Sequence, residues 1–333
     1  MPQRPRLTPA MADVRRAVRE NWDRHGVASG DQILVACSGG ADSLALAAAA
    51  VFEGKRAGVQ VGAVIVEHGL QAATKAVAAK TKELLISLGL NPVLVKTVKV
   101  SGHGGPEAAA RAARYAALDE ESAKFIMLAH TKNDQAETVL LGLARGSGNK
   151  SLNGMVELSG RYLRPLLGIS REITEAFCND SELPFWVDPQ NTDTKFTRVR
   201  VRTELLPQLE RELGPGVVDA LARTAQQLQE DELVLTELAK AYFEESAKLR
   251  ATSIEIPVAD YASMPLAIRH RVLTMALSAM QAPEFSRAHI LAVDELVENW
   301  HGQKPLALPG VRVERNANQI VLRTTKTLKS GAC

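Results

Sequence analysis

The residue types that bind a phosphate anion occur together in one short stretch of the sequence, Cys37-Ser38-Gly39-Gly40-Ala41-Asp42-Ser43. The apolar residues 33–36 before it predict a strand, and the Ala- and Leu-rich residues 44–52 after it predict a buried helix. A strand that ends at Ser-Gly-Gly and continues as a helix leaves backbone N–H groups unpaired at the positive end of the helix dipole. The glycines let an anion approach the backbone, and Asp42 can cap the helix or reach a metal ion. The stretch therefore predicts a phosphate-binding loop, which is not a Walker A loop because Gly-Lys-Ser/Thr is absent.

The pattern Ser-Gly-Gly-x-Asp-Ser resembles the pyrophosphate loop of the N-type (PP-loop) ATP pyrophosphatases. This resemblance implies that ATP is cut between its α and β phosphates and that a substrate is adenylated. The alternative interpretation is an ordinary glycine turn between a strand and a helix. The patterns on both sides of the turn favour the phosphate loop.

Strand and helix patterns alternate along the first half of the chain, which predicts an α/β fold with a doubly wound, mostly parallel sheet. The expected strands are 33–36, 61–67, 92–99 and 125–129, and the expected helices are 8–25, 74–88, 106–121 and 133–144, with another helix starting near Ser170. Ligands bind at the carboxyl ends of parallel strands. Residues 37–43, 67–68 and 130–134 each follow a strand, so we expect one site to gather all three.

The cluster Gly214-Pro215-Gly216 predicts a boundary between two domains. Residues 1–216 form the expected nucleotide-binding domain, in which residues 1–30 are a helical lead-in. Residues 217–333 form a smaller, mainly helical domain that ends in short strands. Its expected helices are 217–248, 265–280 and 286–300, and its expected strands are 305–308, 311–315 and 319–323.

The composition is that of a globular protein without a strong overall charge. The 333 residues are 46% hydrophobic and 23% charged, with a formal net charge of only +2, so a nucleic-acid partner must meet a local basic patch. The cysteines Cys37, Cys178 and Cys333 are odd in number and lack a C-x-x-C pattern, which predicts neither a disulfide framework nor a zinc or iron–sulfur site. No signal peptide and no apolar run long enough to cross a bilayer is expected. These features predict a cytoplasmic protein without a membrane partner.

Further segments carry a second and more specific resemblance, to the bacterial tRNA(Ile)-lysidine synthetases. It is dense over residues 30–210 and weak afterwards. The matching segments are Val66-Glu67-His68-Gly69-Leu70, the Arg111- and Arg114-bearing helix at 107–115, Ala129-His130-Thr131-Lys132-Asn133-Asp134-Gln135-Ala136-Glu137-Thr138, Arg145-Gly146-Ser147-Gly148, and residues 196–207.

The resemblance implies a sheet of the adenine nucleotide α-hydrolase type and a two-step modification of the wobble cytidine of an isoleucine tRNA. ATP adenylates O2 of the cytosine and pyrophosphate leaves. The ε-amine of free L-lysine then attacks C2 and expels AMP. ATP and Mg²⁺ are the implied cofactors, and the tRNA and lysine are the implied partners. A homodimer is compatible with the sequence, which does not decide the oligomeric state.

The resemblance also implies roles for individual residues. The implied catalytic residues are Asp42, Arg114 and Asp134, and Asp42 is also the implied metal ligand. The implied ATP-binding residues are Ser38, Gly39, Gly40, Ala41, Asp42, Ser43, Val66 and His68. The implied substrate-binding residues are Arg111, His130, Glu137, Arg198, Arg200 and Arg202.

The chemistry of these residue types is consistent with those roles. An amine of pKa about 10.4 must lose a proton before it attacks, so a carboxylate such as Asp134 is useful both to bind it and to deprotonate it. Arg111 and Arg114 lie one turn apart on an alanine-rich helix, and small neighbours would let them lie near the sheet to steady a phosphoryl group. Arg198, Arg200 and Arg202 alternate with apolar residues and are predicted to contact RNA phosphates.

Each residue also has a structural alternative. Arg111 could pair with Glu107 on a solvated helix face, and Asp134 could be a helix-terminal carboxylate that interacts with the dipole. His130 could be a ligand contact or a packing residue at a strand end. The three arginines could pair with surface carboxylates instead of RNA.

The sequence departs from the family pattern at a few positions. Thr131 stands where a second histidine is usual, and Asn133 stands where the first of two aspartates is common, which puts a metal role for that position in doubt. Glu67 and Gln71 replace a commoner aspartate and arginine. The residues Asp42, Arg114 and Asp134 are intact.

Three rival functions remain open at this point. A PP-loop enzyme that thiolates tRNA would need a cysteine pair or a C-x-x-C cluster site, which the spacing of the cysteines disfavours. A small-molecule amide synthetase of the amidotransferase type would need a glutaminase partner. A binding module without catalysis is disfavoured by the intact polar residues.

Overall fold

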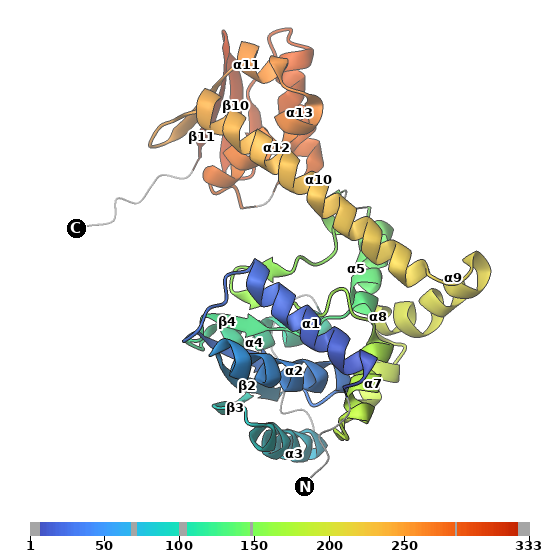
Figure 1. Ribbon diagram of the computed structural model, residues 1–333. Helices are drawn as coiled ribbons and strands as arrows, with labels where there is room; N and C mark the ends of the chain where they lie inside the picture. The colour runs from blue at the N-terminus through green and yellow to red at the C-terminus, as the bar shows by residue number, and fades with distance from the viewer. Residues whose placement is uncertain (1–6, 68–71, 100–104, 147–148, 284, 326–333) are drawn as a thin grey trace. The chain divides into compact units, whose positions relative to one another are not determined.

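The computed structural model describes residues 7–67, 72–99, 105–146, 149–283 and 285–325 (Figure 1). The chain forms two compact units, Met1–Leu228 and Gln229–Cys333. The division falls inside the long helix α10 (Val217–Ser246), so the predicted boundary after Gly216 stays a prediction. In the described part of the chain, no helix is both long and apolar enough to cross a bilayer.

A six-stranded sheet organises the first unit, with the strand order β3-β2-β1-β4-β6-β5. The pairs among β3, β2, β1, β4 and β6 are parallel, and only β5 runs antiparallel to its neighbour. The strands are β1 (Gln32–Ala36), β2 (Gln60–Glu67), β3 (Val93–Thr97), β4 (Phe125–Met127), β5 (Leu158–Ser159) and β6 (Tyr162–Leu163). The predicted mostly parallel sheet is confirmed.

Both faces of the sheet are buried at its central strands β1 and β2, which are apolar on both sides. In β1, Ile33 and Val35 face one core, while Leu34 faces another. The first core holds helices α1 (Pro9–Arg24), α2 (Ala41–Ala57), α3 (Ala72–Leu88) and α7 (Arg171–Asp180). Helix α4 (Pro106–Asp119) covers the opposite face through Leu118 and Tyr115. The doubly wound arrangement is therefore confirmed.

Helical segments follow the sheet strands and carry most of the remaining polar side chains of the site. They are α5 (Lys132–Ala144), α6 (Asn149–Leu152), a 3₁₀ turn (Pro189–Thr192), α8 (Thr197–Arg200), a π-helical turn (Val201–Leu205) and α9 (Leu206–Leu213). Ala136 of α5 packs against Val201 and Leu206. This small apolar contact joins the segment after residue 196 to α5.

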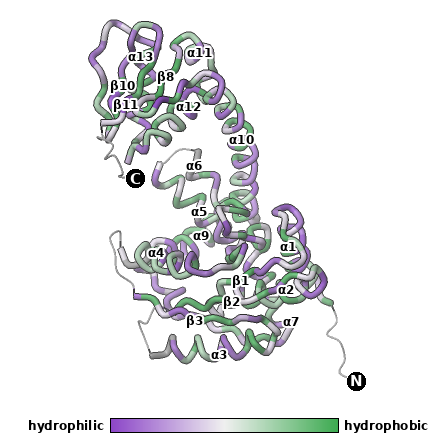
Figure 2. The backbone as a smooth tube through the Cα atoms, turned by 90° about the vertical axis from the view of Figure 1, so that its left-hand side faces the viewer, coloured by the Kyte–Doolittle hydropathy of each residue, from purple (hydrophilic) through white to green (hydrophobic). Residues whose placement is uncertain are grey.

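The second unit has its own core and an antiparallel sheet with the order β7-β8-β11-β10-β9. Its elements are β7 (Lys248–Leu249), β8 (Ser253–Pro257), α11 (Val258–Ser263), α12 (Leu266–Ala279), α13 (Arg287–Glu298), β9 (Leu306–Leu308), β10 (Val311–Asn316) and β11 (Gln319–Thr324). Hydrophobic and hydrophilic residues alternate along α10 (Figure 2), whose Leu235, Ala239 and Phe243 contact this core. The predicted helices and terminal strands are confirmed, while β7, β8 and α11 were not predicted.

Candidate active site

The predicted phosphate-binding loop lies at the carboxyl end of β1. Gly39 has a φ of 85°, and a Cβ added there would lie 2.5 Å from Thr81 Oγ1 of α3, so the turn requires glycine. Helix α2 starts directly after it. Its N-cap residue is Gly40, which has no side chain that could accept a hydrogen bond from the first N–H groups of the helix. The first N–H groups of α2 are therefore not capped by a side chain, as an anion site at a helix N-terminus needs.

Hydrogen bonds from several directions hold this loop in shape. Ser43 Oγ accepts from Ser38 N at 3.2 Å and donates to Gly40 O at 2.9 Å, so its one proton serves the loop itself in this structure. The backbone N–H of Trp186 donates to Gly39 O at 2.9 Å. Cys178 Sγ lies 3.3 Å from Ala41 O as a weak donor. These contacts with α2, α7 and the segment after it fix the shape of the loop.

Asp42 lies in the first turn of α2 and is about three-quarters buried. Its Oδ1 accepts a hydrogen bond from the Thr174 hydroxyl of α7, and its Oδ2 is 3.5 Å from Arg171 Nε. Burial raises the pKa of Asp42, and the negative charge of Asp134 adds to this, while Thr174 and Arg171 oppose it. Asp42 and Asp134 are therefore close enough to influence each other's charge.

Arg171 is the residue that connects these two carboxylates. Its Nη2 is 3.6 Å from Asp134 Oδ1, and its backbone N–H donates to Asn133 Oδ1 at 2.9 Å. Arg171 is not among the predicted site residues. A signal was present, because a cation at the first position of a helix is disfavoured by the helix dipole and calls for a compensating anion.

The two oxygens of Asp134 have different partners. Oδ2 accepts from Thr131 N at 2.8 Å and from Thr131 Oγ1 at 2.9 Å, which closes a capping box at the start of α5. Oδ1 faces three guanidinium groups, Arg171, Arg198 at 3.3 Å and Arg202 at 3.4 Å. Burial alone would raise the pKa of Asp134, but Arg198 and Arg171 outweigh it and hold that pKa below its ordinary value. Asp134 is therefore an ionised carboxylate at neutral pH.

Glu137 lies one turn further along α5 and is completely buried. Arg198 Nε is 2.6 Å from its Oε2, and Arg202 Nε is 2.6 Å from its Oε1. Because residues 197–205 are helical, Arg198 and Arg202 lie on the side that faces α5. These two arginines pair with buried carboxylates, not with the surface carboxylates of the structural alternative.

Arg200 differs from its two neighbours. It is exposed, and its guanidinium donates to Thr194 O at 2.7 Å and to Lys195 O at 3.1 Å. The prediction that the three arginines contact RNA phosphates stays a prediction.

His130 follows β4 on the face of the sheet covered by α4. Its Nδ1 is buried and has no hydrogen-bond partner among the described residues. Burial lowers the pKa of His130 to about 4, with the charges of Arg164, Arg198 and Arg111 in the same direction and Asp134 opposing them. The imidazole is therefore neutral at pH 7.

The arginines predicted on α4 are both exposed. The Arg111 guanidinium lies 4.9 Å from the centre of the Tyr115 ring and donates to the Tyr115 hydroxyl at 3.2 Å. The Arg114 side chain is also exposed, yet the protein atoms around its guanidinium lower its pKa, and its predicted catalytic role stays a prediction. The Glu107 side chain, with which Arg111 could pair, lies outside the described residues.

Val66 is half-buried near the end of β2, on the strand that neighbours β1. The predicted ATP-binding residue His68, as well as Gln71, Ser147 and Gly148, lies outside the described residues. Two groups of predicted site residues do follow adjacent strands. Ser38 to Ser43, which include Asp42, follow β1, and His130, Asp134 and Glu137 follow β4.

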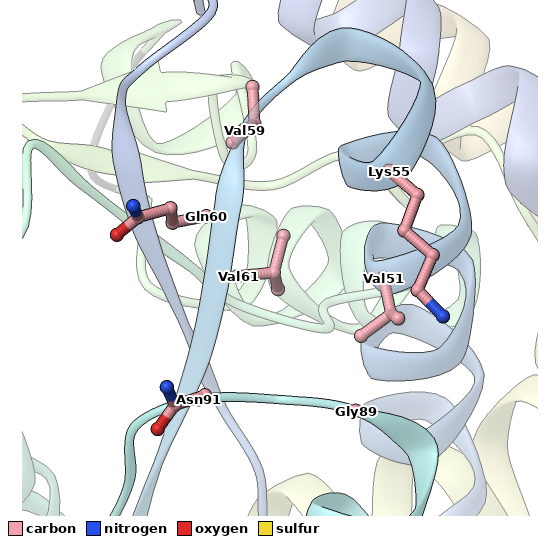
Figure 3. A pocket seen from close by; sticks show the side chains of 7 residues that line it. All are labelled: Val51, Lys55, Val59, Gln60, Val61, Gly89 and Asn91. Carbon is pink, nitrogen blue, oxygen red and sulfur yellow. The ribbon is translucent and has the colours of Figure 1, made fainter.

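A pocket of about 340 Å³ lies elsewhere in the first unit (Figure 3). It is lined by Val51, Lys55, Val59, Gln60, Val61, Gly89 and Asn91. Gln60 begins β2 and Asn91 precedes β3, so the pocket lies at the amino ends of the parallel strands. It is therefore separate from the site at their carboxyl ends.

Most of this chain is similar to known proteins of one family. The chain is 53% identical over 296 residues to a tRNA(Ile)-lysidine synthase of Leifsonia xyli subsp. xyli, a match that covers 87% of this chain and 89% of that protein. The chain belongs to the tRNA(Ile)-lysidine synthase family. A tRNA(Ile)-lysidine synthase of Streptomyces coelicolor is 46% identical over 309 residues, covering 90% of this chain and 87% of its own length. The resemblance inferred from the motifs is confirmed.

Two domains of known families can be located in this chain. Residues 11–209 match the PP-loop domain, and residues 257–320 match the TilS substrate binding domain. The U34-tRNA thiolase NcsA from Methanococcus maripaludis has a similar fold, with a TM-score of 0.55 and 18% identity over 66% of this chain and 80% of that one. The predicted PP-loop fold with a second, smaller domain is confirmed.

Proposed function

We propose that this protein ligates lysine to C2 of the wobble cytidine of isoleucine tRNA with a CAU anticodon, using ATP. One observation carries the proposal. A chain of the tRNA(Ile)-lysidine synthase family brings the phosphate loop after β1 and the polar cluster after β4 together through Arg171. ATP and an acceptor can therefore meet between two neighbouring strands.

The first step is adenylation of the tRNA. The loop residues Ser38 to Ser43 bind the ATP phosphates through backbone N–H groups at the start of α2, and Val66 lies on the adenosine side. Cytosine O2 attacks the α phosphorus, the bond to the β phosphate breaks, and pyrophosphate leaves. Arg171, beside Asp42, supplies positive charge where charge develops on the phosphoryl group. The same task predicted for Arg114 stays a prediction.

The second step is attack by the amine of lysine. Nζ forms a bond to C2, the bond from C2 to the phosphorylated oxygen breaks, AMP leaves with that oxygen, and the amine gives its proton to solvent water. A carboxylate whose pKa is lowered binds a cation well but accepts a proton weakly. We therefore assign Asp134 to binding and orienting the ammonium group more than to removing its proton. Glu137 accepts hydrogen bonds from Arg198 and Arg202 and so holds both guanidinium groups in position.

The residues present fit Mg²⁺ bound in one particular manner. No group of three or more His, Cys, Asp or Glu side chains that could hold a metal lies together in the described part of the chain. Mg²⁺ is commonly held by one or two carboxylates together with substrate phosphates. Asp42, at the first turn after the phosphate loop, is the carboxylate suited to this, and the ion would neutralise charge on the leaving pyrophosphate.

The thiolation alternative is not supported by the cysteine environments. Cys37 and Cys178 are both buried, and burial raises the pKa of Cys178 to about 12 and that of Cys37 as well. Neither thiol is set up as a nucleophile. The amide synthetase alternative has no observation in its favour.

The test is incorporation of radiolabelled lysine into total tRNA, with and without ATP. We expect label in an isoleucine tRNA only when ATP is present. Sulfur incorporation, or no lysine incorporation by folded protein, would contradict the proposal. A cytoplasmic location and a homodimer stay predictions, which fractionation and sedimentation equilibrium respectively would test.

A further inference from the structure

A buried guanidinium and a buried imidazole lie on the face of the sheet that α4 covers. Tyr162 of β6 and Leu128 beside β4 both face this side, and the parallel register pairs Met127 with Leu163. Because side chains alternate along strands, Arg164 follows Leu163 on the same side as Tyr162. His130 is two residues beyond Leu128 and so leaves β4 on that side too.

Arg164 differs from the arginines around Asp134. It is 6% exposed, and its Nη1 donates to Val156 O at 2.9 Å, which fixes the guanidinium. Arg171, Arg198 and Arg202 each face a carboxylate, whereas no ion pair joins Arg164 to a carboxylate of the described residues. Its Nε is buried without a hydrogen-bond partner in that part of the chain.

His130 has the same property. Its buried Nδ1 is unpartnered among the residues described, and the charge of Arg164 acts on its ring. Buried polar groups are almost always hydrogen-bonded, and an unpaired buried charge is costly. The unpartnered nitrogens of Arg164 and His130 therefore predict a ligand with several acceptor atoms, and the charge of Arg164 predicts that this ligand is an anion.

The strand order indicates which substrate supplies that anion. The order β2-β1-β4-β6 puts the ATP side at β2 and β1, and parallel strands lie about 4.8 Å apart. Arg164, after β6, is two strands beyond the phosphate loop, on the far side of Asp134. It therefore lies on the acceptor side of the reaction.

We propose that Arg164 and His130 bind the α-carboxylate of the amino-acid substrate while Asp134 binds its ε-ammonium group. This assignment rests on the proposed function. The planar guanidinium matches a carboxylate in two hydrogen bonds. Its deep burial favours a small enclosed anion over a phosphate of the RNA backbone, which exposed cations ordinarily contact.

The test compares lysine with 1,5-diaminopentane, which is lysine without its carboxylate. In wild-type protein, we expect the KM for the diamine to exceed that for lysine by about tenfold or more, the worth of a charged hydrogen bond. Arg164→Met should raise the KM for lysine to the value for the diamine. It should leave the KM for the diamine and for ATP unchanged.

Arg161→Met is the matched control. The guanidinium of Arg161 also donates to a backbone carbonyl, Ala123 O, and its Nε is also unpartnered among the described residues. Arg161 precedes β6, however, so it lies at the opposite end of that strand from Arg164. We expect this variant to discriminate between the two amines as the wild type does.

Several results would overturn the assignment. One is an equal KM for lysine and the diamine in wild-type protein, which needs no variant to fold. Another is an Arg164→Met variant that loses both amines equally or that loses tRNA affinity with a smaller salt slope, as a phosphate contact would. Absence of any lysine incorporation by wild-type protein would instead contradict the proposed function itself.

Discussion

Asp134 combines a structural and a chemical task in one side chain, because each oxygen has its own partners. Oδ2 closes the capping box with Thr131, and Oδ1 faces the arginines. The helix-terminal role that we weighed against catalysis is therefore present together with the charged cluster. Removing the charge while keeping the shape separates the two.

We expect Asp134→Asn to retain the fold, because an amide oxygen can still accept from Thr131. Lysidine formation at low lysine concentration should fall by roughly tenfold or more, the worth of a charged hydrogen bond to the ammonium group, while tRNA adenylated from α-labelled ATP accumulates. Absence of any labelled tRNA would assign Asp134 to the first step instead. Full lysidine formation would leave Asp134 with its capping role alone.

Asp42 is the carboxylate of the phosphate loop itself. We expect Asp42→Ala to abolish tRNA-dependent pyrophosphate release while the circular dichroism spectrum stays that of the wild type. Asp31→Ala is the control. Asp31 pairs with Lys124 at the amino ends of β1 and β4, away from the site at their carboxyl ends. Normal release by the Asp42 variant would exclude its role with the metal and phosphates.

His130 predicts how stability responds to acid. Burial lowers its pKa to about 4 in the folded protein, while an imidazole in an unfolded chain titrates near 6.5. Between these values the unfolded chain binds more protons, so the free energy of unfolding falls as pH falls, by up to about 1.4 kcal/mol per pH unit. We expect His130→Gln to lose less stability than the wild type between pH 7 and pH 5 in urea unfolding. Equal losses would contradict the shift.

At the level of elements, Glu137 ties the segment 197–205 to α5. Removing it leaves Arg198 and Arg202 partly buried without their main partner. We expect Glu137→Ala to lower the free energy of unfolding by about 3–5 kcal/mol, measured by denaturant unfolding. Arg200→Ala, on the same segment but exposed, should change it by less than about 1 kcal/mol.

Because Arg198 and Arg202 pair with Glu137 and Arg200 does not, RNA contact is best tested at Arg200 alone. Neutralising all three arginines would disturb the Glu137 pairs and confuse unfolding with lost binding. Arg200→Gln alone leaves those pairs intact. We expect it to reduce the salt slope of tRNA binding by about one phosphate contact. An unchanged slope would remove Arg200 from the RNA interface.

Local patterns were sufficient for most elements of the sheet. The apolar stretch before Cys37 and the alanine-rich stretch after Asp42 became β1 and α2, because both faces of the sheet need apolar cover. Ser253 to Pro257 has the alternation of a strand, with Ile254 and Ile256 buried, yet it was missed beside the long helical pattern of α10. The Arg198–Glu137 pair joins residues far apart in sequence, and no local pattern in one sequence specifies such a partner.

At the level of the whole molecule, the two units have separate cores. In the second unit, the Tyr261 hydroxyl donates to Asp294 at 2.7 Å in a buried position. We expect Tyr261→Phe to destabilise that unit by about 1–3 kcal/mol, since Asp294 loses a donor. Hydrogen exchange should accelerate within residues 229–333 and stay unchanged in the sheet of the first unit. Acceleration in both would contradict independent cores.

The contact between Gly39 and Thr81 has a consequence for how this loop can vary. A side chain at position 39 would meet both a positive φ and the Thr81 hydroxyl, whereas a Cβ at position 40 would have no neighbour closer than 3.7 Å. We therefore expect substitutions at Gly39 to prevent folding, and small substitutions at Gly40 to be compatible with folding. A library covering both positions, selected first for folded protein and then for ATP use, would find Gly40→Ala after the first selection. If the selection for ATP use then removes Gly40→Ala, the added methyl group must occupy space that the nucleotide requires.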